Sequence, residues 1–391
     1  MSPLLFVLIM EYFHRVLQSL SRVPNFNFHP KCEKMKIINL RFADDILMFV
    51  RGDLESIKLL MDKVRDFSTS TGLKISVPKS KIYFGGVDDN TINQIQQETG
   101  FAVGNMPFRY LGVPLASKKL TVSQCQALIE KMLARLKHWS TRLLSYVGRV
   151  QLLKSVIFSI ANYWMQIFPS PKKVISHINS ICSSFMWTGK ESLTRKAPVA
   201  WDHICNPLSA GGLNMISLLE WNKATIGKLL WNVCEKKDRL WINWIHAYYI
   251  KKSYPTTFCP GIQCSWILKA MFKHRDDLLQ SDAWKGFQNT GKYVTRKIYH
   301  MLREDKPKVT WRKIFYGNLA RPRAKFILWM TCLDRLPTKD RLHRFGVVTD
   351  CKCVFCGLTE TCDHLFFECA TTKKVWADIL RWISIMRIPG G

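Results

Sequence analysis

Two adjacent carboxylates, Asp44 and Asp45, stand between two short apolar runs. The runs Ile37 to Arg41 and Ile46 to Val50 are rich in β-branched and large apolar residues, which predicts two buried strands joined by a hairpin turn. Adjacent carboxylates repel unless a divalent cation neutralises them, and two-metal polymerases use such groups to clamp the oxygens of a phosphoryl transfer. Because aspartate is also an ordinary turn residue, the pair alone leaves both interpretations open.

A second group with metal-binding chemistry lies near the C-terminal end: Cys353, Cys356, His364 and Cys369. The first two residues are close together on a tight turn, and the other two follow after a short loop. Four ligands spaced in this way can coordinate Zn²⁺ tetrahedrally. Cys351 and Cys362 are further thiols, and either could replace a neighbour as ligand. Because no secretory signal is found, the 13 cysteines are better explained as reduced thiols and metal ligands than as disulfides.

Several recognisable segments follow the Asp pair along the chain. Asp53 can cap a helix, and Gly72 can end it in a left-handed conformation. A lysine-rich block continues to Lys81, a strand-like Ile82 to Phe84 follows, and Arg109 to Leu115 comes later.

In that order and spacing, these blocks resemble the late palm motifs of a non-LTR (LINE-type) retrotransposon reverse transcriptase, most like those of plant elements. By this resemblance, Asp44 and Asp45 match the Asp pair that binds catalytic Mg²⁺, and Lys79 matches the lysine after the palm helix. The primer grip is matched by Tyr110, Leu111 and Gly112. The alternatives are a solvated lysine at Lys79 and a half-buried strand aromatic at Tyr110. Ser76 stands where the family usually has Asn.

The first residues, Met1 to Glu11, resemble the tail of the family motif Gln-Gly-Asp-Pro-Leu-Ser-Pro-Leu-Leu-Phe. Ser2 and Pro3 predict the start of an ordinary buried helix through about Leu20, whereas a signal peptide would need a basic stretch ahead of the apolar run. The family completes its metal site with another Asp on an upstream strand. Without that residue we expect weak Mg²⁺ binding and no polymerisation by this chain alone.

The net positive charge of the chain indicates a nucleic-acid partner. Lys and Arg total 58 against 29 Asp and Glu, a net charge of +29. A membrane-surface partner is not expected, because the sequence shows no lipidation signal. The expected partners are RNA and DNA as template and primer. The alternative is a zinc-centred protein- or nucleic-acid-interaction module without enzymatic activity.

Two segments carry most of the candidate phosphate contacts. Residues 118–154 hold eight Lys or Arg and one acid on amphipathic helices, which the resemblance assigns to the thumb. Residues 285–344 hold sixteen Lys or Arg and four acids. The candidate nucleic-acid-binding residues in these segments are Lys118, Lys119, Arg142, Arg149, Arg321, Arg323 and Lys325.

The segment from Tyr293 to Trp382 resembles the zinc-binding domain that follows reverse transcriptase in plant LINE-type elements. The resemblance rests on Trp311, the run Pro322 to Trp329, Leu336 to Thr338 and the Cys/His group. Between residues 189 and 284 lie seven tryptophans, which are better explained as helical core than as base-stacking residues.

The expected fold class is α+β. We predict a partial reverse-transcriptase palm with a β-hairpin at 1–116, a helical thumb at 117–188 and a helical connector at 189–284. A small, mainly helical zinc-binding domain is predicted at 285–391. The expected location is inside the cell, with the nucleus favoured over the cytoplasm.

Overall fold

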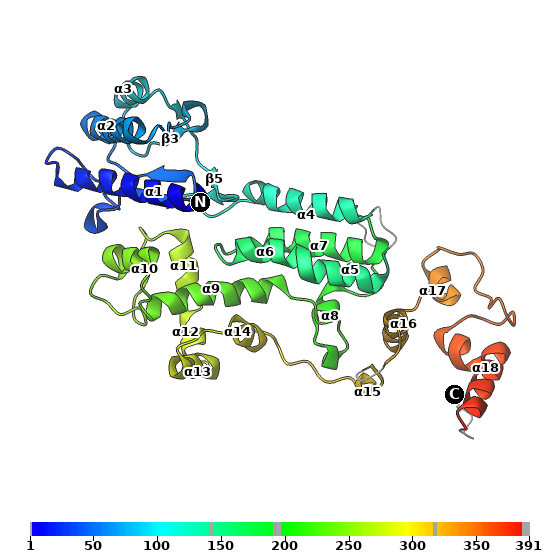
Figure 1. Ribbon diagram of the computed structural model, residues 1–391. Coiled ribbons are helices and arrows are strands. Elements are labelled where there is room, and N and C mark those ends of the chain that lie inside the picture. The colour runs from blue at the N-terminus through cyan, green and yellow to red at the C-terminus, as the bar shows by residue number, and fades with distance from the viewer. Residues whose placement is uncertain (1, 141–143, 191, 193–196, 316–318, 385–391) are drawn as a thin grey trace. The chain divides into compact units, whose positions relative to one another are not determined.

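The computed structural model describes residues 2–140, 144–190, 192, 197–315 and 319–384 (Figure 1). These residues are mainly helical with three two-stranded sheets, which confirms the predicted α+β class. The chain divides into two compact units: Met1–Gln124 with Thr225–Thr295, and Cys125–Ala224 with Arg296–Gly391. The division crosses the expected 189–284 connector inside a helix, and the domain boundaries stay predictions.

The first unit begins with a palm-like part of helices and short strands. Its strands pair as β1–β2 and β5–β6, both antiparallel, and β3–β4, parallel. The elements are α1 (Ser2–Gln18), β1 (Asn39–Phe42), β2 (Asp45–Met48), α2 (Leu54–Thr71), η3 (Val77–Lys79), β3 (Lys81–Ile82), α3 (Asp89–Thr99), β4 (Ala102–Val103), β5 (Phe108–Tyr110) and β6 (Val113–Leu115).

The core of this part lies between α1, α2 and the β1–β2 hairpin. The rings of Phe13 and Phe67 meet with centroids 4.4 Å apart. Ile46 and Met48 of β2 pack against the same cluster, so the face of β2 that carries Asp45 is turned away from it. The buried cluster consists of Met10, Phe13, Leu17, Leu20, Phe26, Ile38, Leu60, Val64 and Phe67.

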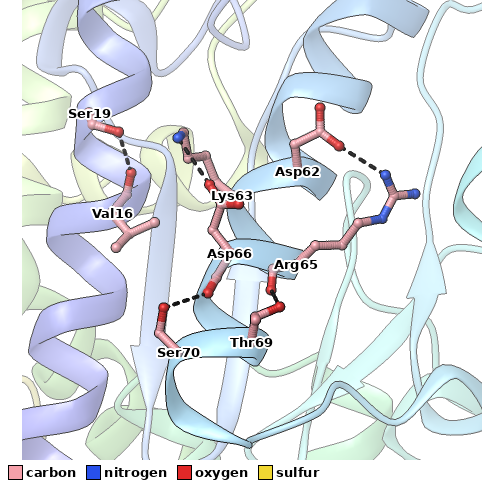
Figure 2. Close-up of polar contacts among 8 residues, drawn as sticks. All are labelled: Val16, Ser19, Asp62, Lys63, Arg65, Asp66, Thr69 and Ser70. Carbon is pink, nitrogen blue, oxygen red and sulfur yellow. Dashed lines mark hydrogen bonds and ion pairs between the residues drawn. The ribbon is translucent and has the colours of Figure 1, made fainter.

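Helix α2 has the ends that the sequence predicts. Asp53 accepts a hydrogen bond from the Ser56 N–H at 2.8 Å, and Gly72 ends the helix with φ +74°. Figure 2 shows its solvent face, where Arg65 pairs with Asp62 at 2.9 Å and Lys63 with Asp66 at 3.2 Å. Such exposed pairs stabilise a helix by only a few tenths of a kcal/mol each, so the buried face holds α2 in place.

Helix α1 is buried along only one face, so the prediction of an ordinary buried helix holds in part. Phe13 and Leu17 lie in the core, whereas Leu4 and Leu8 are exposed. Among the described residues, Pro3–Arg22 is the one helical stretch long and apolar enough to cross a membrane. One such stretch is weak evidence for a span, because mostly buried core helices and signal sequences near an N-terminus pass the same test.

The rest of the first unit is helical and is built around tryptophan. The ring of Trp231 meets those of Trp284, Phe287 and Tyr293 at 5.0, 5.9 and 6.2 Å, and Trp231 and Trp284 are fully buried. This confirms the core interpretation for these two tryptophans. The elements are the second part of α9 (Leu218–Cys234), α10 (Leu240–Ile245), η7 (His246–Ile250), α11 (Trp266–Phe272), α12 (Arg275–Leu279) and α13 (Asp282–Thr290).

In the described residues of the second unit the regular elements are helices, together with one isolated β-bridge between Lys352 and Thr359. Pro169 and Pro171 separate α6 from α7, and Asn222 donates to the freed carbonyls of Met165 and Phe168 at 2.9 Å each. The elements are α4 (Gln126–Ser140), α5 (Tyr146–Leu152), η5 (Leu153–Ile157), α6 (Phe158–Met165), α7 (Lys172–Thr188), α8 (Trp201–Cys205), η6 (Leu208–Ala210), α14 (Thr295–Met301), α15 (Arg312–Phe315), α16 (Pro322–Cys332), α17 (Lys339–Arg344), η8 (His364–Glu368) and α18 (Ala370–Trp382).

Aromatic packing joins the zinc-binding segment to the preceding helices of this unit. Phe326 of α16 stacks on Tyr146 of α5 at 4.8 Å, and Trp329 stacks on Trp187 at 6.5 Å. The Trp329 indole N–H donates to the Gly211 carbonyl at 2.8 Å. Gly211 has φ +81°, which explains why a glycine stands there.

Candidate metal and nucleic-acid sites

The β1–β2 hairpin places the Asp pair at its exposed tip. Phe42 pairs with Asp45, so Ala43 and Asp44 form a two-residue turn. Ala43 has φ +51°, a conformation that glycine usually supplies and that costs another residue about 1 kcal/mol or more. Both carboxylates are exposed to solvent, as a site open to a metal ion and a substrate phosphate requires.

Arg41 holds this hairpin against α1. Its guanidinium donates to the Met10 carbonyl and lies 3.5 Å from the Glu11 carboxylate. The pKa of Glu11 is lowered, first by the hydrogen bond from Arg15 and also, against partial desolvation, by that from Arg41. The neighbouring Asn39 amide lies 3.0 Å from the His14 ring nitrogen. These contacts fix the hairpin relative to the helix.

The β5–β6 hairpin brings a second predicted site residue towards the Asp pair. Leu111 and Gly112 form its turn with φ +50° and +78°, the two positive values that a type I′ hairpin needs. Burial raises the pKa of the Tyr110 hydroxyl, and the charge of Asp45 raises it further. Tyr110 therefore lies within electrostatic reach of Asp45, which the sequence order alone does not show.

Lys79 lies at the end of η3, with its side chain exposed. Its backbone N–H donates to the Ser76 carbonyl at 3.1 Å, which tightens the segment after α2. No contact of the Lys79 ammonium group with Asp44 or Asp45 is found among the described residues. Its role in the polymerase site stays a prediction.

The Cys/His group forms the most compact site in the described part of the chain. The ligand atoms of Cys353, Cys356, His364 and Cys369 all lie within 4.8 Å of one another, and the Cys356 sulfur is 3.1 Å from the His364 Nε2. Cys353, His364 and Cys369 are buried. Among the described residues, this is the one group of three or more His, Cys, Asp or Glu side chains close enough to share a metal ion.

Local backbone structure brings the four side chains together. Cys353 and Cys356 lie on a tight loop in which the Gly357 N–H donates to the Cys353 carbonyl at 2.9 Å and Gly357 has φ +76°. His364 begins the π-helical turn η8, and Cys369 closes that turn by donating its N–H to the His364 carbonyl at 2.8 Å. Such wide turns are frequent at functional sites.

The electrostatics of the group favour a bound cation. Desolvation opposes ionisation of the Cys369 thiol, but hydrogen bonds from the Thr372 and Thr371 backbone and from the Cys356 and Cys353 thiols lower its pKa to about 6. The lowered pKa favours the thiolate of Cys369, the form that binds Zn²⁺. Against a hydrogen bond from the Leu358 backbone, desolvation and hydrogen bonds with Cys369 and Cys353 raise the pKa of the Cys356 thiol. Three sulfurs and one imidazole nitrogen fit a tetrahedral zinc site.

The two surplus thiols lie outside this group. Cys351 accepts a hydrogen bond from the Glu360 N–H through its backbone carbonyl at 2.8 Å. The pKa of Cys362 is raised by burial and then by the negative charges of Asp334, Asp363 and Asp340, so its thiol faces a different, acidic environment. The structure thus brings the proposed quartet together without either alternative, although the ligand assignment stays a prediction.

The candidate phosphate-binding cations have different surroundings. Lys118, Lys119, Arg321 and Arg323 are exposed, and Lys325 is half-buried. Arg149 donates to the Met186 and Trp187 carbonyls at 3.2 and 3.4 Å and lies over the Tyr146 ring, so it also stabilises the C-terminal end of α7. Arg142 lies outside the described residues.

The sequence interpretation missed the role of Arg41. A hydrogen bond to a carbonyl 31 positions away has no local signature, because any exposed arginine on a strand looks the same in one sequence. The signal that could have been used is the alternation of β1, which places Arg41 on the same face as the buried Asn39.

Comparison with known proteins gives two family matches and a curated relative. Residues 1–115 match the family model described as reverse transcriptase (RNA-dependent DNA polymerase), and residues 293–376 match that described as zinc-binding in reverse transcriptase. A protein of Arabidopsis thaliana that bears the name ribonuclease H protein is 25% identical over 129 residues. This match covers 33% of the chain and 21% of that protein, so it spans about a fifth of the relative.

Proposed function

We propose that this chain, a relative of retrotransposon-type reverse transcriptases that carries their zinc-binding domain, binds RNA and DNA through the cationic helices ahead of its zinc site. The matches to both family models, at residues 1–115 and 293–376, support this proposal. The observation that carries it is the charge of residues 285–344, where sixteen Lys or Arg stand against four acids. A phosphate backbone binds such a surface with little dependence on base sequence.

The N-terminal end of α16 is the part of this surface best suited to phosphate. Arg321 precedes the helix without a side-chain cap, and Pro322 and Arg323 stand in its exposed first turn. Backbone N–H groups at a helix start favour an anion, and the two guanidinium groups add fixed positive charge. Other cations in the same stretch of sequence include Arg296, Lys297, Lys313, Lys325 and Arg335.

We expect affinity for an RNA–DNA hybrid to fall steeply between about 50 and 200 mM salt, with little dependence on sequence. Arg321→Gln with Arg323→Gln should lower the slope of log affinity against log salt by about one for each phosphate that the protein no longer neutralises. Fluorescence anisotropy with labelled hybrids measures both. Lys236→Gln with Arg239→Gln removes the same charge from exposed positions in the first unit and should leave the slope nearly unchanged.

A flat salt response would contradict the proposal and favour the zinc-centred protein-interaction module. Equal reductions of the slope in the 321/323 variant and the 236/239 variant would place the binding surface elsewhere, because both variants remove two positive charges.

For the Asp pair, we propose residual Mg²⁺ binding by Asp44 and Asp45 at the hairpin tip. Mg²⁺ needs a fixed octahedral geometry and is bound weakly by two solvent-exposed carboxylates. We therefore expect no primer extension by the purified chain with Mg²⁺ or Mn²⁺ and all four deoxynucleotides. Incorporation that disappears in Asp44→Ala but persists in Asp62→Ala, an exposed acid on α2, would show that this chain polymerises on its own.

A further inference from the structure

The zinc module, which we define as residues 345–391, lacks the net positive charge of the segment that precedes it. This stretch carries five Lys or Arg and five Asp or Glu, whereas the sixty residues before it have a net charge of +12. Phosphate attraction therefore belongs to the preceding helices. The zinc module is electrically neutral in a chain of net charge +29.

Helix α18 of this module exposes a stripe of apolar side chains to solvent. Its thirteen residues include none that is buried. The stripe consists of Val375, Ile379, Trp382 and, directly after the helix, Ile383, which are 52, 42, 85 and 47% exposed. Their spacing of four, three and one residues places them on one face of the helix.

This exposure is unusual for a short helix. Helices below about 12–15 residues are marginal in water, and most gain their stability from packing an apolar face. Trp376 packs inside the module, where its indole N–H donates to the Phe366 carbonyl at 2.8 Å. The stripe itself exposes on the order of 500 Å², which is in the range of the largest apolar patch on a typical soluble monomer, and such patches are often functional.

We propose that the stripe of α18 binds the same stripe of a second copy of this chain, in a symmetric helix pair. A two-fold contact places one patch against itself, and one row of apolar residues along a helix can satisfy this geometry. Two chains of charge +29 repel each other wherever their basic segments approach, and the neutral zinc module that carries the stripe lacks this repulsion. This pairing is independent of the proposed nucleic-acid binding.

The area of the stripe limits the affinity that we expect of the helix pair. Burial of about 500 Å² on each partner lies below the roughly 800 Å² of a standard stable interface. We therefore expect a concentration-dependent dimer with a dissociation constant in the micromolar range.

Analytical ultracentrifugation of the zinc-loaded, nuclease-treated full chain tests the proposal. The wild-type chain should shift from 45.5 kDa to twice that mass as its concentration rises from about 1 to 100 µM. Val375→Lys with Ile379→Lys should weaken the dimer at least about tenfold, because burying a lysine in a helix pair is costly. Trp382→Ser, at the most exposed position of the stripe, should also weaken the dimer.

Lys374→Gln with Arg381→Gln, which lie on α18 away from the stripe, is the matched control and should leave the dimer intact. Zinc content measured on every variant separates a failure of pairing from a failure of the fold. A chain that stays monomeric at all concentrations overturns the proposal. So does a dimer that survives both the 375/379 variant and Trp382→Ser with zinc bound.

Discussion

Removal of zinc should unfold the C-terminal module, and we expect this to be the largest single effect on the chain. Among the described residues from 345 to 384, the only buried side chains are Cys353, His364 and Cys369, so the metal ligands themselves form the core. Small zinc domains gain roughly 10–16 kcal/mol of apparent binding free energy at pH 7, and this energy drives their folding. Hydrogen exchange of the η8 and α18 amides, with and without a chelator, measures the unfolding.

Single substitutions identify the ligands. Cys353→Ser, Cys356→Ser, His364→Ala and Cys369→Ser should each abolish the one bound Zn²⁺ per chain in elemental analysis. Cys351→Ser and Cys362→Ser should keep it, because the structure places both thiols outside the four-atom group. Zinc that is absent from either surplus-thiol variant and present in a quartet variant would overturn the assignment. A wild-type chain without zinc would overturn the site.

The second large effect is expected at Trp231. Trp231→Ala would leave a cavity among Trp284, Phe287 and Tyr293, and such truncations of buried aromatics cost about 3–5 kcal/mol. The free energy of unfolding, measured by urea denaturation with hydrogen exchange of the α9 and α13 amides, should fall by that amount. Zinc content should be unchanged, because the zinc ligands belong to the other unit.

Trp231→Phe is the matched control. The Trp231 indole N–H is buried without a hydrogen-bond partner in the described structure, and an unsatisfied buried donor costs about 1–3 kcal/mol. Phenylalanine removes that donor and keeps an aromatic ring, so this variant should lose far less stability than Trp231→Ala. Equal destabilisation in both variants would show that Trp231 is held by something other than ring packing.

Local features were predictable from the sequence because neighbours in the chain decide them. The capping of α2 by Asp53 and its end at Gly72 depend on residues within one turn. The same holds for the turn at Gly211. The Cys/His quartet was predictable for a related reason, since all four ligands fall within 17 consecutive residues of the sequence.

Features that depend on distant contacts were not predictable. Arg41 contacts Met10, 31 positions away in the sequence, and Tyr110 lies near Asp45, 65 positions away. Each strand of the first hairpin also extends one residue closer to the turn than the apolar run that predicted it, and is two residues shorter at its other end. The exposed stripe of α18 was not predicted, because apolar spacing on a helix predicts a face to be buried and does not say by what.

The path of the chain through the first unit has a consequence for synthesis. That unit needs Met1–Gln124 together with Thr225–Thr295, so a ribosome must add about a hundred intervening residues before the tryptophan-rich helices are available. Closing a loop of this length costs only slightly more entropy than closing a short one, but at about 5–20 residues per second it imposes a delay of several seconds. During that delay the N-terminal segment of the unit lacks its contacts with the residues from Thr225 to Thr295.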